Sequence, residues 1–288
     1  MIVFLNGKFV AEEQAVVSVF DRGFLYGDGL FEALRVANGK PFRWDQHWQR
    51  LERGAQFLKF KLAYSRDQLR EFAHELIAQN NLPESLLRLT VSRGIGPRGY
   101  SPKGADHTTT VLSLHDVPAV DPTQPPQWRL VTASPRLPAA EPVAQYKTCN
   151  KLAQVLARGE ADAAQANEAL LLNTNGFVIE GASSNLFWVQ NGALCTPPLV
   201  SGVLAGVTRA VVSELCGTLG LQLREAEAVP DQLRQMDAVF LSLSTVGIAE
   251  AVSLDNLPVH ESPVVKQLSV AYWEKVRNET WGITRGRR

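Results

Sequence analysis

The sequence predicts an α+β fold in which mainly antiparallel sheets carry flanking helices. Asn-Gly pairs recur between apolar or alternating runs, and this dipeptide accepts the positive φ angles of a tight hairpin turn. Helix patterns lie between the pairs without strict alternation of strand and helix, which favours antiparallel pairing. The four pairs are Asn6-Gly7, Asn38-Gly39, Asn175-Gly176 and Asn191-Gly192.

Helices are predicted from apolar spacing and from their end signals. In the segment 65–81, Ser65 and Gln68 form a capping-box pattern, and the apolar residues that follow recur at i, i+3, i+4 and i+7. An alanine-rich run is interpreted as an ordinary helix. The other predicted helices are 45–60, 208–220 with its stop at Gly220, and the alanine-rich run 157–170.

A proline-rich segment predicts the division of the chain into two domains. The chain has 288 residues, 45% of them hydrophobic, which is enough apolar material for two cores. Residues 118–127 contain several prolines and no periodicity, so we interpret them as a linker. The predicted domains are 1–117 and 128–288.

Composition argues against several classes of function. The 29 basic and 29 acidic side chains cancel, which disfavours broad electrostatic binding to nucleic acid or to an anionic membrane. No apolar stretch approaches the roughly 20 residues that span a bilayer, and the N-terminus lacks the pattern of a signal peptide. The three cysteines form no C-x-x-C pair, so we expect no metal site and reduced thiols in a cytoplasmic protein.

Two ionisable residues are candidates for covalent and acid-base chemistry. Lys147, in "YKTCNKL", precedes a helix pattern and is expected at a strand end or turn. A lone lysine is usually a solvated charge, but a lysine desolvated near another cation becomes a nucleophile. Glu180, in "GFVIEGASSN", ends an apolar strand. It is either a member of a structural ion pair or a partner for a protonated ring nitrogen.

Other residues could bind anions. Val207 and Thr208 follow Gly206 at the start of a helix, where free amides and the helix dipole favour phosphate, although Gly-x-Thr also occurs as a simple cap. Arg50, in "HWQRLERG", could clamp the same anion or be an exposed helix arginine. Arg98 and Tyr100, in "SRGIGPRGYSP", could grip a carboxylate or belong to an ordinary turn.

An amine, a buried acid and a phosphate site are the parts that hold pyridoxal 5′-phosphate. Several motifs in one order along nearly the whole chain resemble the class IV aminotransferase family, the fold-type IV enzymes that use this cofactor. The motifs are "DRGFLYGDGLFEALRV", "HWQRLERG", "SRGIGPRGYS", "YKTCNKL", "EGASSNLF", "GVTRAVV" and "FLSLSTVGI".

The resemblance implies a role for each matching residue. Lys147 matches the lysine that forms the internal aldimine and later moves the proton, and Glu180 matches the acid that pairs with the pyridine nitrogen. The phosphate-binding positions are Arg50, Val207, Thr208 and Ser244, with Thr245 as a substitute for Ser244. The resemblance also implies a cofactor at the domain junction of a homodimer, with a loop of the second subunit at the edge of the pocket.

The subfamily is less defined than the family. Arg98 is the best candidate for holding a substrate carboxylate, with Tyr100 and Arg35 at the pocket edge. The pattern "RGxGxRGY" resembles 4-amino-4-deoxychorismate lyase, which releases pyruvate and 4-aminobenzoate. Ala33, however, stands where the lyases carry threonine and branched-chain enzymes glycine, and Phe31 stands where D-amino-acid enzymes carry tyrosine.

We therefore expect an aminotransferase that moves an amino group between an amino acid or amine and an α-keto acid. The lyase is the first alternative. A catalytically silent protein that only binds the cofactor is the second, but such a relative would be expected to lose Lys147 or Glu180, and this chain keeps both.

Overall fold

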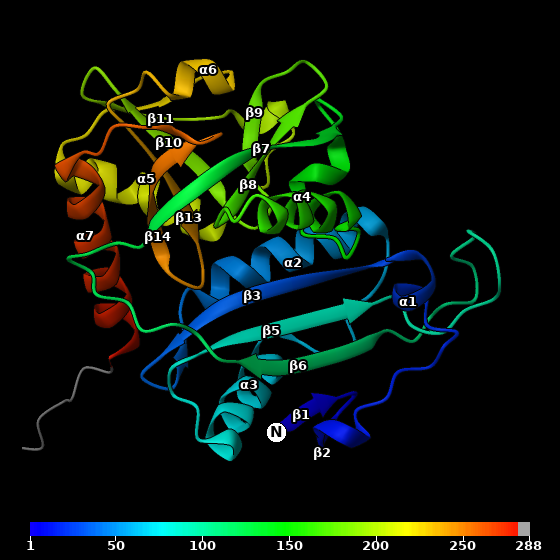
Figure 1. Cartoon of the computed structure of the whole chain (residues 1–288). Coiled ribbons are helices and arrows are strands. Elements are labelled where there is room, and N and C mark those ends of the chain that lie inside the picture. Colours follow the sequence, from blue (N-terminus) through cyan, green and yellow to red (C-terminus); the bar gives the residue numbers. More distant parts are fainter. Residues whose placement is uncertain (282–288) are drawn as a thin grey trace, which may run out of the picture. The chain divides into compact units, whose positions relative to one another are not determined.

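The computed structural model describes residues 1–281 and groups the chain into two compact units (Figure 1). The first unit contains Met1–Val117, Tyr146–Asn150 and the described residues 275–281. The second unit contains Pro118–Gln145 and Lys151–Glu274. The short segment around Lys147 thus groups with the N-terminal part of the chain, although it is distant from that part in sequence.

The first unit is built on a six-stranded sheet in the order β2-β1-β6-β5-β3-β4, with every pair antiparallel. Figure 1 shows its long strands β3, β5 and β6 side by side. The strands are β1 Ile2–Leu5, β2 Lys8–Ala11, β3 Gly29–Ala37, β4 Lys40–Pro41, β5 Ser85–Ser92 and β6 Thr109–His115. The helices are α1 Arg22–Tyr26, α2 Trp44–Leu58 and α3 Arg66–Asn80, with a 3-10 turn at Glu12–Gln14.

One face of this sheet packs against α2 and α3. Leu30 and Leu34 of β3 belong to the same buried cluster as Leu51 of α2 and Leu76 of α3. Because side chains alternate along a strand, Glu32 shares the buried face with the two leucines of β3. The residues between them, at positions 31, 33 and 35, face the other side of the sheet.

The second unit contains a nine-stranded sheet in the order β12-β11-β10-β13-β14-β7-β8-β9, with β15 on β14 and a further β9–β10 pairing. The strands are β7 Gln127–Leu137, β8 Glu168–Asn173, β9 Val178–Gly181, β10 Asn185–Gln190, β11 Ala193–Thr196, β12 Leu223–Glu225, β13 Ala238–Leu243, β14 Gly247–Leu254 and β15 Leu257–Pro258. The remaining helices are α4 Leu152–Ala163, α5 Val207–Leu219, α6 Pro230–Leu233 and α7 Pro263–Thr280, with 3-10 turns at Pro142–Gln145 and Leu199–Ser201.

The α+β prediction is confirmed, and the local signals behind it form as expected. Each of the four Asn-Gly pairs lies between two antiparallel strands, namely β1–β2, β3–β4, β8–β9 and β10–β11. Helix α3 has its full capping box, with Ser65 as the N-cap and Gln68 reaching back. Helix α5 ends at Gly220, whose φ of 67° is left-handed.

The alanine-rich run differs from its prediction. Helix α4 begins earlier, at Leu152, and ends at Ala163, while Glu168 already starts strand β8. Gln165 adopts a left-handed φ of 53°, which breaks the helix. Every residue of β8 is buried, so pairing with β7 and β9 outweighs the helix propensity of the alanines.

The described residues contain no helix that combines the length and the apolar character needed to cross a membrane.

Candidate active site

Lys147 lies against the edge of strand β3 in the first unit. The Phe31 N–H donates to the Lys147 carbonyl at 2.9 Å, and the Cys149 N–H donates to the Gly29 carbonyl at 2.9 Å. These bonds flank an isolated antiparallel bridge between Leu30 and Thr148, which holds the lysine segment against β3. The Lys147 Nζ lies 4.7 Å from the centroid of the Phe31 ring, within the range of a cation–π contact.

A second cation contacts the same ring. The Arg88 Cζ lies 4.0 Å from the Phe31 centroid, and Arg88 pairs directly with Ala33 across β5 and β3. Burial lowers the pKa of Arg88 from its ordinary value. Within residues 1–281 this guanidinium bonds Thr90 Oγ1 and pairs with no carboxylate. Phe31, Ala33, Arg88 and Lys147 therefore form a half-buried, positively charged surface that suits a carboxylate.

Sequence reasoning missed Arg88, although a signal for it exists. In "SLLRLTVS" the arginine alternates with core-facing leucines, so the period of the strand places it on the face away from the core. A charged residue at such a position indicates that this face of the sheet is not covered by the apolar core.

On the buried face of the same strand, Glu32 binds Arg50 of α2. The Arg50 Nε donates to Glu32 Oε1 at 2.8 Å, and Arg50 Nη2 donates to Glu32 Oε2 at 2.5 Å. Both side chains are buried, so Arg50 is not an exposed helix arginine. The carboxylate occupies one edge of the guanidinium and fixes its plane.

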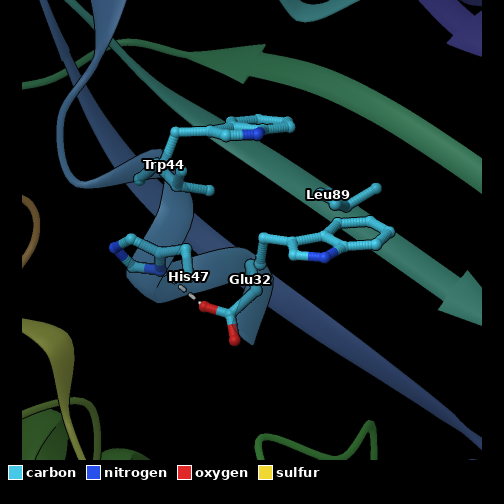
Figure 2. Close-up of a pocket in the computed structure, with 6 residues that line it drawn as sticks. Glu32, Trp44, His47 and Leu89 are labelled. Carbon is cyan, nitrogen blue, oxygen red and sulfur yellow. Dashed lines mark hydrogen bonds and ion pairs between the residues drawn. The ribbon is translucent and has the colours of Figure 1, made fainter. Parts of the chain in front are cut away.

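His47, one turn before Arg50, completes this cluster. Its Nδ1 lies 2.6 Å from Glu32 Oε2, and Figure 2 shows the ring turned toward the carboxylate. Burial lowers the pKa of His47, and the charges of Arg50 and Lys147 lower it further, against the opposing effect of Glu32. Because a carboxylate only accepts, the neutral ring donates from Nδ1 and keeps Nε2 as an acceptor. A small pocket beside the cluster is lined by Glu32, Leu34, Trp44, His47, Trp48 and Leu89.

Glu32 is ionised throughout the physiological range. Burial alone would raise its pKa, but the charge of Arg50 and the hydrogen bonds from Arg50 and His47 outweigh burial and lower the pKa to about 2. The sequence contained a signal for this residue as well, since an acid stands between two leucines on the core-facing period of "GLFEALRV". A buried charge needs a partner, and α2 supplies it.

In the second unit, strand pairing places Glu180 beside the segment that leads into α5. Glu180 lies opposite Asn185, and Asn185 lies opposite Ser242, so the three side chains share one face. The Leu204 N–H donates to Glu180 Oε2 at 3.0 Å, and Asn185 Nδ2 donates to the Leu204 carbonyl at 2.9 Å. The buried Glu180 carboxylate is therefore bound by the backbone of Leu204, which lies two residues before the N-cap of α5.

The start of α5 has the features of an anion site. Its N-cap is Gly206, so no side chain caps the helix in the described structure. A Cβ at Gly206 would come within 1.9 Å of Asn185 Oδ1, so a larger residue there would have to displace the Asn185 side chain. Val207 and Thr208, the first helical residues, are both buried. The N–H groups of this first turn have no partner within the helix and favour a bound anion.

Ser244 and Thr245 lie in the turn between β13 and β14, and both are half-buried. They follow Ser242 by two and three residues. The Ser242 Oγ is buried and lacks a hydrogen-bond partner among residues 1–281. Ser242 lies on the same face of the sheet as Glu180. A buried hydroxyl without a protein partner on this face is consistent with a polar ligand that binds there.

The remaining predicted residues lie elsewhere in the first unit. Arg98 and Tyr100 project from the loop between β5 and β6, and 87% of the Tyr100 surface is exposed. Arg35 is buried and pairs with Glu84 at 2.7 Å. Among the described residues, no cluster of three or more His, Cys, Asp or Glu side chains could hold a metal ion.

Solved structures with the same fold cover almost the whole chain. The branched-chain amino acid aminotransferase of Escherichia coli superposes with a TM-score of 0.89 at 29% identity, covering 99% of this chain and 97% of that one. The T.th. branched-chain amino acid aminotransferase, solved with pyridoxamine 5′-phosphate, gives a TM-score of 0.89 at 28% identity, covering 97% of this chain and 96% of that one.

Curated relatives differ in activity but match over similar lengths. A provisionally named branched-chain-amino-acid aminotransferase of Methanocaldococcus jannaschii is 34% identical, with 98% of each chain covered. A D-alanine aminotransferase of Staphylococcus aureus is 28% identical over 96% of this chain and 99% of its own. The aminodeoxychorismate lyase of Bacillus subtilis is also 28% identical, over 96% of this chain and 95% of its own.

The model of one family matches residues 29–254, which include Lys147, Glu180 and the start of α5. On this match and on the relatives above, the chain belongs to the class IV aminotransferase family, whose enzymes depend on pyridoxal 5′-phosphate.

Proposed function

We propose that this enzyme moves an amino group between an amino acid or amine and an α-keto acid, with pyridoxal 5′-phosphate bound to Lys147. The observation that carries the proposal is the amine of Lys147, held at the edge of β3 against Phe31 with the Arg88 guanidinium on the same ring. This arrangement presents a nucleophile beside a carboxylate-binding surface.

The residues that the family resemblance assigns to the cofactor have the chemistry to hold it. Its phosphate would be bound by Arg50, by the first amides of α5 at Val207 and Thr208, and by Ser244 or Thr245. Glu180, buried and held by the Leu204 amide, would accept a hydrogen bond from the protonated ring nitrogen. When bound, pyridoxal phosphate supplies an aldehyde that exchanges with the amino group and a ring that withdraws electrons.

The chain's own groups then orient the substrate and move the proton. The Lys147 amine would remove the proton from the substrate α-carbon as a general base and would then deliver it, as a general acid, to the cofactor carbon. We propose that Arg88 binds the substrate carboxylate, because its half-buried charge has no carboxylate partner within residues 1–281. Arg98 stays a candidate for binding the substrate carboxylate together with Arg88, whereas the pairing of Arg35 with Glu84 argues against a substrate role for Arg35.

Lyase activity is the second candidate function. The loop sequence with Arg98 and Tyr100 favours it, and the similarity to the lyase of Bacillus subtilis equals that to the D-alanine enzyme. A protein that binds the cofactor without catalysis would show neither activity.

A paired assay on the purified, yellow protein distinguishes these functions. Incubation with L-leucine, D-alanine or an (R)-amine alone is expected to convert the bound pyridoxal form to the pyridoxamine form, with a shift in the absorption band, and an added α-keto acid is expected to restore the original band. Aminodeoxychorismate is expected to give no pyruvate. Pyruvate release without the pyridoxamine form would replace the proposal with the lyase, and an unchanged band with every substrate would leave a silent protein.

We further propose a cytoplasmic homodimer with small-molecule substrates. Large apolar side chains are exposed on the segment that includes α1, among them Val16 at 76%, Phe20 at 65% and Phe24 at 74% exposure. Burying such side chains against a second copy is favourable. Sedimentation is expected to give twice the mass of one chain, and Phe24→Asp to shift it toward the monomer. A wild-type monomer at micromolar concentration would contradict the proposal.

A further inference from the structure

The loop between β5 and β6 is fastened at its tip by one buried side chain. Arg22, at the start of α1, is 3% exposed. Its Nη1 donates to the carbonyls of Gly99 at 2.9 Å and Ser101 at 3.1 Å, and its Nη2 donates to the carbonyl of Tyr100 at 3.1 Å. A planar guanidinium thus binds three consecutive backbone carbonyls of a segment that is far from it in sequence.

The Arg22 guanidinium, which we call the clamp, is itself held by neighbouring side chains. The Nε of Arg22 pairs with Asp28 Oδ2 at 2.9 Å, and the guanidinium lies 4.9 Å from the centroid of the Tyr26 ring. The Tyr26 hydroxyl accepts a hydrogen bond from the Gly99 N–H at 3.0 Å. A side chain at Gly96 would come within 3.0 Å of the Arg22 Cδ, so the stem of the loop also lies close to this arginine.

Asp21 ties the base of the loop to the same helix. Its carboxylate accepts hydrogen bonds from Ser92 Oγ at 2.9 Å and from Thr109 Oγ1 at 2.6 Å, which are the last residue of β5 and the first of β6. The Arg22 N–H donates to the Gly94 carbonyl at 2.8 Å. The loop backbone is therefore bound at both its base and its tip.

The backbone of the loop tip is bound by Arg22, but the Arg98 and Tyr100 side chains at the tip are exposed. The structure gives Arg98 no hydrogen bond or ion pair with any residue of the range 1–281. A fixed backbone with outward-facing polar side chains is the arrangement that presents binding groups at low entropic cost.

We propose that Arg22 is a positioning residue, which fixes the loop so that Arg98 and Tyr100 are presented to the carboxylate of the substrate. The loop is then preorganised rather than a lid that closes on binding. The substrate role of Arg98 rests on the function proposed above, whereas the fastening of the loop does not.

The test compares Arg22→Lys with Arg93→Lys in the holoenzyme. Arg93 also pairs with Asp28, at 2.7 Å, but its other donors bind the carbonyls of Leu58 and Lys59 and not the loop tip. Arg22→Lys is expected to raise KM for the amino acid about tenfold or more while kcat and the cofactor absorption change little. Arg93→Lys is expected to leave KM within about twofold of the wild type.

A double variant shows whether Arg22 acts through Arg98. If it does, Arg22→Lys combined with Arg98→Ala is expected to raise KM no more than Arg98→Ala alone. Additive effects would overturn the positioning role. So would an unchanged KM in Arg22→Lys.

Limited trypsin digestion, which needs no substrate, measures how firmly Arg22 holds the loop. Cleavage after Arg98 and Lys103 is expected to be about tenfold faster in Arg22→Lys than in the wild type, because the loop opens more often. If Arg22→Lys does not fold, Tyr26→Phe removes only the acceptor for Gly99 and is expected to accelerate cleavage about threefold. Equal cleavage rates in the wild type and the folded variant would overturn the clamp. A wild type without transaminase activity would count against the proposed function alone.

Discussion

Lys147→Ala is expected to lower transamination by about 1,000-fold or more, because the variant loses both the covalent attachment of the cofactor and the base that moves the proton. The backbone bonds of residues 147 and 149 to β3 do not involve the side chain, so the fold should be retained. Single-turnover kinetics, followed by the absorption of the bound cofactor, would measure the loss.

Lys147→Arg is the matched variant. It keeps the positive charge near Phe31, but a guanidinium stays protonated and cannot condense with an aldehyde. We expect it to be as inactive as the alanine variant. If either variant kept wild-type turnover, Lys147 would not be the catalytic amine.

Glu32→Ala is expected to destabilise the enzyme by about 3–5 kcal/mol, because it leaves the Arg50 guanidinium buried without its carboxylate. The arginine also loses the bond that fixes its plane, so its grip on the cofactor phosphate should weaken. Urea unfolding would give the change in the free energy of unfolding, and a cofactor titration would give the change in affinity.

Glu84→Gln serves as the control for this variant. Glu84 also pairs with a buried arginine, Arg35, but 52% of its own side chain is exposed. Removing its charge should cost about 1 kcal/mol or less and leave cofactor affinity unchanged. Similar losses for the two variants would show that the cluster of Glu32, His47 and Arg50 has no special role.

The same cluster predicts how stability depends on pH. The pKa of Glu32 lies at about 2 in the folded protein, below its ordinary value of 4.5. Its contribution to stability is therefore complete above pH 4.5 and is lost as pH falls from there toward 2. Glu32→Gln is expected to reduce the slope of unfolding free energy against pH in this range, and an unchanged slope would contradict the assignment.

Local signals made much of the fold predictable. The capping box of α3, the glycine that ends α5 and the Asn-Gly hairpins depend on residues a few positions apart, so the sequence contains the whole interaction. The alanine-rich run shows where this stops. Its second half forms β8 because two neighbouring strands bury it, and those neighbours come from distant parts of the chain.

The candidate site could be predicted only in part, for the same reason. Lys147 was identified by its motif, but its pairing with β3 joins residues more than a hundred positions apart. Glu32 and Arg50 meet because helix α2 packs on strand β3. The spacing of residues in the sequence does not predict this contact. Arg88 and Glu32 each left a period-two signal, which becomes readable once the buried face of β3 and β5 is known.

The central claim is that the Lys147 amine holds the cofactor covalently. Borohydride reduction of the yellow protein, followed by proteolysis and mass spectrometry of the peptides, tests this claim directly. We expect the phosphopyridoxyl group on the peptide that contains Lys147, and on no other lysine. A group attached to a different lysine, or a reduced protein that carries none, would contradict it.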